Sequence, residues 1–140
     1  MIKLSRLTDY AVVILAEMSR SRREDGGELI AASTLSSRTG IPEPTVSKVL
    51  KTLSRNGLIV SVRGVSGGYR LDMAAADLPV SQIIAAMEGP ISLTSCVTGS
   101  HESCGLEGRC SMHGRWNPVN AAIRGALDQV TLADMYMGRA

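Results

Sequence analysis

The sequence predicts a mainly α-helical protein with one small β-hairpin. Three observations lead to this prediction. Apolar residues recur at helical spacing in several segments, residues 58–72 change to a strand pattern around three glycines, and residues 89–116 show no period. With 44% hydrophobic but only 3% aromatic residues, the chain can bury a core built mainly from Leu, Ile, Val, Ala and Met.

The first predicted helix covers residues 5–19. Its apolar side chains recur at helical spacing and define one face that we expect to pack into the core. These side chains are Leu7, Ala11, Ile14, Leu15 and Met18.

Two shorter helices follow. The first covers residues 31–40 and stops at Gly40. The second has Pro44 in its first turn, where the missing N–H is tolerated, and ends at Asn56-Gly57. Four apolar residues at i, i+3, i+4 and i+7 give the second helix a buried stripe, made of Val46, Val49, Leu50 and Leu53.

Residues 58–72 predict a hairpin with Gly64, Gly67 and Gly68 at its turn. Two short helices followed by such a hairpin form a winged helix–turn–helix. The face opposite the buried stripe then carries hydroxyls and cations that suit base edges and phosphates in a major groove. It consists of Thr45, Ser47, Lys48, Lys51, Thr52 and Arg55, and the hairpin adds Arg63 and Arg70.

Charge is distributed unevenly along the chain. Residues 1–70 carry 11 Lys/Arg and 6 Asp/Glu, whereas residues 71–140 carry 4 and 7. A basic amino-terminal half favours a polyanion partner such as double-stranded DNA for that half. The alternative is a winged helix that contacts proteins, with its polar face merely solvated.

The carboxy-terminal half predicts a short helix over residues 80–89 and a longer one beginning at Asn117-Pro118, read as N-cap and first helical position. The longer helix carries an apolar stripe of Val119, Ile123, Ala126, Leu127 and Val130. The stripe could cover its own domain, but a chain this short offers little further core, which favours a homodimer. We therefore expect a DNA-binding domain over residues 1–78, and a loop with a dimerisation helix over residues 79–140.

All three cysteines and both histidines lie between residues 96 and 113. Cys96, Cys104 and Cys110 with His113 could hold zinc or an iron–sulfur cluster, because both favour soft ligands. Structural zinc sites usually contain closely spaced pairs, so the wide gaps here favour the larger cluster. The alternatives are a thiol redox switch without metal, or cysteines that serve only as small hydrophobic residues.

Four stretches of the chain are familiar. LTDYAVVIL at residues 7–15, RNGLIVSVRGVSGGYRL at 55–71, AMEGP at 86–90 and CSMHGRW at 110–116 resemble the bacterial IscR/NsrR-type family of winged-helix iron–sulfur regulators. The resemblance implies a dimeric transcription factor that binds a pseudo-palindromic operator and holds a cluster through Cys96, Cys104 and Cys110. RWNPVN and TLADM resemble members that regulate the SUF cluster-assembly operon.

The same resemblance leaves two fourth ligands open. His113 matches the position used by members with a [2Fe–2S] cluster, and we favour it. Asp9 matches a carboxylate that some [4Fe–4S] members donate from the partner subunit. The competing functions are a nitric-oxide-sensing or redox-sensing repressor of the same family, and a zinc-stabilised winged-helix protein-interaction module.

Other sequence patterns bear on where the protein is found and on whether it is an enzyme. No apolar run approaches the roughly 20 residues of a membrane span, and the amino terminus has no signal-peptide core, so we expect a soluble cytoplasmic protein. Cysteines in that compartment stay reduced. The sequence contains no CxxC, nucleotide-binding loop or paired carboxylates, and we expect no enzymatic activity.

Overall fold

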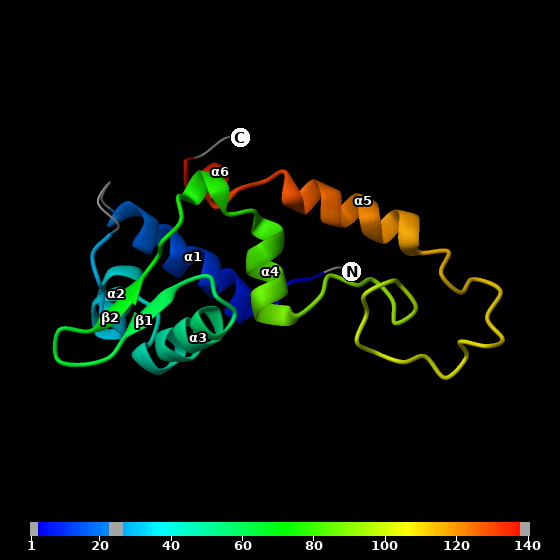
Figure 1. Cartoon of the computed structure of the whole chain (residues 1–140), viewed down its shortest axis with the longest axis horizontal. Helices are drawn as coiled ribbons and strands as arrows, with labels where there is room; N and C mark the ends of the chain where they lie inside the picture. The colour runs from blue at the N-terminus through cyan, green and yellow to red at the C-terminus, as the bar shows by residue number, and fades with distance from the viewer. Residues whose placement is uncertain (1–2, 23–26, 138–140) are drawn as a thin grey trace.

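The computed structural model describes residues 3–22 and 27–137, and most of its secondary structure is helical (Figure 1). The elements are α1 (Arg6–Arg20), α2 (Ala32–Thr39), α3 (Glu43–Arg55), β1 (Val60–Val62), β2 (Gly68–Arg70), the 3-10 helix η1 (Ala75–Asp77), α4 (Val80–Glu88), α5 (Asn117–Asp128) and α6 (Leu132–Tyr136). The structure is mainly α-helical with a two-stranded antiparallel hairpin, which confirms the predicted fold class.

Local chemistry explains where the first three helices begin and end. Ser5 is the N-cap of α1, and its hydroxyl accepts a hydrogen bond from the Thr8 backbone N–H at 3.2 Å. Gly40 ends α2 in the left-handed conformation with φ of 77°, which glycine adopts without strain. Pro44 lies in the first turn of α3, as the sequence predicts.

The wing, residues 60–70, is held to the rest of the chain by a contact that the sequence does not reveal. Its strands pair Ser61 with Tyr69, and Tyr69 also exchanges two backbone hydrogen bonds of 2.9 Å with Ile30. A Cβ on Gly68 would lie 2.8 Å from the Ile30 carbonyl oxygen, so only glycine allows this close approach. The base of the wing is thereby joined to the segment before α2.

The core lies between α1, α2, α3, α4 and α6. The apolar faces predicted for α1 and α3 are buried there, with Ala11, Ile14, Leu15 and Met18 from α1. The predicted stripe of α3 is inaccessible to solvent along its whole length: Val46, Val49, Leu50 and Leu53. Leu7, by contrast, is only half-buried, and Thr8 takes a fully buried position on α1.

The structure divides into a body (residues 3–22, 27–88 and 131–137) and an arm (residues 89–130). In Figure 1 the arm, made of the long loop and α5, projects away from the body and returns to it at α6. Two backbone hydrogen bonds of 2.8 Å secure the return, from Val80 N–H to the Val130 carbonyl and from Leu132 N–H to the Leu78 carbonyl. Helix α6, which the sequence pattern did not reveal, buries Leu132 completely.

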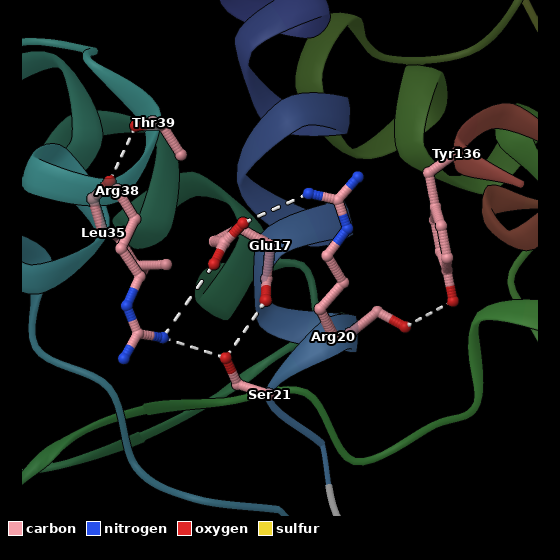
Figure 2. Close-up of polar contacts among 8 residues, drawn as sticks. Glu17, Arg20, Ser21, Leu35, Arg38, Thr39 and Tyr136 are labelled. Atoms are coloured by element: carbon pink, nitrogen blue, oxygen red, sulfur yellow. Dashed lines mark hydrogen bonds and ion pairs between the residues drawn. The ribbon is translucent and has the colours of Figure 1, made fainter.

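Polar contacts also attach α6 to the body (Figure 2). The Tyr136 hydroxyl and the Ser19 hydroxyl are 3.2 Å apart, and the Arg20 guanidinium carbon lies 5.7 Å from the centre of the Tyr136 ring. Glu17 lies between Arg20 and Arg38, with nitrogen–oxygen distances of 3.5 and 3.9 Å. The carboxy-terminal helix therefore contacts α1 directly and is connected through Glu17 to α2.

Candidate nucleic-acid interface and cysteine loop

Helix α3 presents its cations to solvent. Lys48, Lys51 and Arg55 are exposed and lie at i, i+3 and i+7, which places them on one side of the helix. The predicted hydroxyl residues Thr45, Ser47 and Thr52 are half-buried, and the Thr52 hydroxyl donates to the Lys48 carbonyl at 3.0 Å. The exposed face of α3 is thus dominated by positive charge, with hydroxyls along its edge.

The wing continues this basic surface. A concavity of about 420 Å³ is lined by Lys51 of α3 and by Arg63, Gly67 and Tyr69 of the wing. Val65, at the tip of the wing, is fully exposed. The fold therefore brings Lys51 and Arg63, twelve residues apart in the chain, to the same hollow.

Arg70 differs from the other predicted DNA-contacting cations because it is the one that forms an ion pair within the described residues. Its Nε donates to Asp72 Oδ1 at 2.6 Å, and this hydrogen bond raises the pKa of the guanidinium. Arg22 donates to the Asp72 carbonyl at 3.3 Å. Asp72 therefore joins the end of α1 to the base of the wing.

The predicted cluster ligands lie on a loop without regular secondary structure between α4 and α5. Cys96 and Cys104 are half-buried, Cys110 and His113 are exposed, and the three thiols are free. Within residues 3–22 and 27–137, no three His, Cys, Asp or Glu side chains lie close enough together to hold a metal ion. The structure therefore shows the donors on one loop but not gathered around one point.

Cys96 has the most structured surroundings of the three cysteines. Its sulfur lies 3.2 Å from the Thr94 hydroxyl, and hydrogen bonds from that hydroxyl and from the Gly114 backbone lower the pKa of the thiol. A lowered pKa favours the thiolate, which is the form that binds iron and zinc. The contact with Gly114 also brings Cys96 next to the turn that carries His113.

Two asparagines at the start of α5 hold the first part of the loop. Asn120 is only 4% exposed, accepts a hydrogen bond from the Leu93 N–H at 2.9 Å and donates to the Ile91 carbonyl at 3.0 Å. Asn117 accepts from the Thr98 N–H at 2.9 Å. Neither asparagine was predicted to contact the loop, although a polar residue in an apolar-striped helix beside the cysteines was a usable signal.

The predicted start of α5 needs a correction of one residue. Trp116, not Asn117, is the N-cap, and Asn117 is the first helical residue. The Asn117 side chain makes no capping bond because its oxygen accepts from Thr98 instead. Asn117 therefore uses its side chain to hold the loop and not to cap its own helix.

Asp9, the alternative cluster ligand, lies on the body. It is exposed in the first turn of α1 and lines a hollow of about 860 Å³ with Lys3, Leu4, Ser5, Arg6 and Glu88. No cysteine lines this hollow. A role for Asp9 as a ligand would therefore require the loop of a second subunit.

Known proteins resemble this chain in sequence along nearly its full length. The model of the Rrf2 family, described as iron-dependent transcriptional regulators, matches residues 4–138. The transcriptional regulator IscR of Photobacterium profundum is 31% identical over 128 residues, covering 90% of this chain and 70% of that one. IscR of Serratia proteamaculans is 30% identical over 126 residues, with 90% and 74% covered.

Two solved structures have folds similar to that of this chain. T. potens IscR superposes with a TM-score of 0.67 at 26% identity, covering 97% of this chain and 87% of that one. CymR, the global cysteine regulator of B. subtilis, superposes with a TM-score of 0.70 at 24% identity and 98% coverage of both chains. Among the described residues, no helix is long and apolar enough to cross a membrane.

Proposed function

The chain belongs to the Rrf2 family of transcriptional regulators, and from that premise we propose that it is a cytoplasmic, homodimeric repressor of SUF-type cluster-assembly genes. In this proposal residues 1–78 read the operator. Residues 79–140 carry the cluster loop and the dimerisation helix. The state of an iron–sulfur cluster sets the affinity for DNA.

The hollow shared by Lys51 and Arg63 supports the DNA-reading role. Helix α3 enters the major groove in this arrangement, while the wing follows the neighbouring backbone. Exposed cations on both elements suit phosphates, and the half-buried hydroxyls of Thr45 and Ser47 suit base edges. We assign Arg70 a smaller contribution to DNA binding because its guanidinium already pairs with Asp72.

The exposed apolar side of α5 supports a homodimer. Val119 is 44% exposed, and Ile123 and Leu127 are only half-buried in the single chain. Val130, predicted as the end of this stripe, lies beyond the helix, which stops at Asp128, and is 38% exposed. In the proposal a second copy covers this stripe, and the resulting pair of α3 helices reads successive major grooves, which are about 34 Å apart. That symmetry would in turn require a pseudo-palindromic operator.

The donor set of the loop fits an iron–sulfur cluster. Cys96, Cys104 and Cys110 supply three free thiols, and the hydrogen bonds at Cys96 lower the pKa of its thiol, which favours the charged form that binds iron. His113 completes the set for [2Fe–2S], which we favour, and the partner subunit's Asp9 would do so for [4Fe–4S]. When bound, the cluster would supply a redox-active centre that can lose an electron to an oxidant.

The loop leads directly into α5, so a change in the loop reaches the dimer interface without passing through the core. A coupling free energy of about 1–3 kcal/mol between loop and operator would change DNA affinity about 5–150-fold. That range is sufficient for a repressor to release its operator.

Anaerobic purification with a visible spectrum and with iron and sulfide analysis tests the proposal. We expect coloured protein, and we expect Cys104→Ala to lose the colour while its circular dichroism stays helical. His113→Ala should alter the spectrum and His101→Ala, on the same loop, should not. Colourless wild-type protein that contains zinc would overturn the proposal in favour of a protein-interaction module.

A second measurement separates the repressor from its alternatives. Operator affinity is compared between cluster-loaded and cluster-free protein, and a difference of at least fivefold is expected. Equal affinities would contradict cluster control even if the cluster is present. A response to nitric oxide but not to cluster assembly would favour the nitric-oxide-sensing repressor.

A further inference from the structure

The buried side chain of Asn120 uses both ends of its amide to hold loop backbone. The oxygen accepts from Leu93 N–H and the nitrogen donates to the Ile91 carbonyl, at 2.9 and 3.0 Å. A buried amide with satisfied partners is costly to remove, because its loss leaves backbone groups without hydrogen bonds. Asn120 thus fixes the path of the chain just before Cys96.

Asn117 fixes the path just after Cys96. It lies three residues before Asn120, so both amides face the loop from the same side of α5. Its oxygen accepts from Thr98 N–H at 2.9 Å, and the neighbouring Val97 is 4% exposed. Cys96 is therefore held between two anchored points, Leu93 and Thr98, beside the first turns of α5.

The other two proposed thiol ligands, Cys104 and Cys110, lack such anchors. Among the described residues, the backbone hydrogen bonds of residues 104–113 close short local turns, such as Glu107 N–H to the Cys104 carbonyl and His113 N–H to the Cys110 carbonyl. No salt bridge joins this part of the described chain to another element. The loop thus combines one anchored thiol with donors on an unanchored segment.

We propose that Asn117 and Asn120 are positioning residues that hold Cys96 beside α5 before the cluster binds. Cys96 is then the first ligand, and the segment carrying Cys104, Cys110 and His113 closes around it. Because Asn120 is next to Val119 on α5, a shift of the anchored segment reaches the apolar stripe directly. This inference rests on the proposed function and adds the route from loop to dimer.

Amide hydrogen exchange of the cluster-free protein tests the anchors without any metal. In Asn120→Ala the Leu93 amide should exchange about fivefold faster or more, and in Asn117→Ala the Thr98 amide should do so, because each loses its acceptor. Gln129→Ala, at the other end of α5, is the matched control and should change neither. Unchanged exchange in both asparagine variants would overturn the proposal.

Cluster release tests the consequence. Transfer of iron to a ferrous chelator should be about 10–100-fold faster in Asn120→Ala, with an altered visible circular dichroism spectrum, because supporting residues usually affect metal affinity on this scale. Asn120→Asp keeps the acceptor for Leu93 but loses the donor to Ile91, and an intermediate rate is expected. Wild-type release rates in all variants would overturn the positioning role.

The outcomes also separate this inference from the proposed function. If wild-type protein purified without oxygen contains no iron, the proposed function fails, while amide exchange still decides whether the asparagines anchor the loop. If Asn120→Ala does not fold, Asn117→Ala carries the test, since Asn117 is only half-buried. Unchanged exchange at the buried amides of Ile14 and Leu50 verifies that the body is intact.

Discussion

The body and the arm differ in what holds them together. Apart from Val97, all the buried hydrophobic residues of the described chain lie in the body, whereas between residues 89 and 130 only Val97 and Asn120 are buried. The body is stabilised by apolar packing, which a single chain completes. The arm depends mainly on a few hydrogen bonds and leaves the apolar stripe of α5 partly exposed.

This difference separates two tasks. A DNA-reading surface needs a rigid support, because the cations of α3 and the wing must match the spacing of phosphates. A sensing element needs alternative arrangements of similar free energy, which a weakly packed segment supplies. On this view the body is self-sufficient, whereas the arm needs a second copy.

Core truncation should produce the largest effect, and only in the body. Leu50→Ala removes a fully buried side chain from α3 and should lower the free energy of unfolding by about 2–5 kcal/mol. Leu106→Ala, in the arm, removes a side chain that is 65% exposed and should change it by less than about 0.5 kcal/mol. Urea denaturation followed by circular dichroism measures both, and equal losses would invalidate the distinction.

Charge on the uncovered stripe should break the dimer. Val119→Asp places a carboxylate in the proposed interface, so the protein should sediment as a monomer and bind its operator about 100-fold more weakly. Ala121→Asp introduces the same charge on the opposite flank of α5 and serves as the control. Monomeric wild-type protein, or dimeric Val119→Asp, would show that the stripe has another role.

Loss of one phosphate contact should change the salt dependence of DNA binding. Lys51→Ala and Arg63→Ala should each reduce the slope of log affinity against log salt by about 0.9 if each residue contacts one phosphate. Arg109→Ala removes an exposed cation from the arm and should leave the slope unchanged. An equal reduction in all three variants would mean that the arm also contacts DNA.

The smallest effect concerns the junction between arm and body. Tyr136→Phe removes the hydroxyl that contacts Ser19 and should lower the free energy of unfolding by about 0.5–1.5 kcal/mol. Tyr10→Phe is the matched control, since the Tyr10 hydroxyl forms no hydrogen bond within the described residues. If both variants behave alike, the Tyr136 hydroxyl does not secure α6.

Much of the body was predictable because helical periodicity is a local property. The buried stripe of α3 and the stop at Gly40 follow from residues that are close in sequence. Helix α6 was not predicted because its five residues are too few to show a helical period. It is stabilised by the buried Leu132 and by a capping box at Thr131. The Ile30–Tyr69 pairing was not predicted because its partners are 39 residues apart.

By itself, the amino-acid sequence determined which chemical groups this protein carries and which helix faces are apolar, because both depend only on residue type and spacing. It placed three thiols on one loop and cations opposite a buried stripe. Only the tertiary structure decided that Asn117 and Asn120 bind loop backbone, that Lys51 and Arg63 line the same hollow, and that the stripe of α5 stays partly exposed. Those relations depend on the path of the chain between distant residues, which no local pattern records.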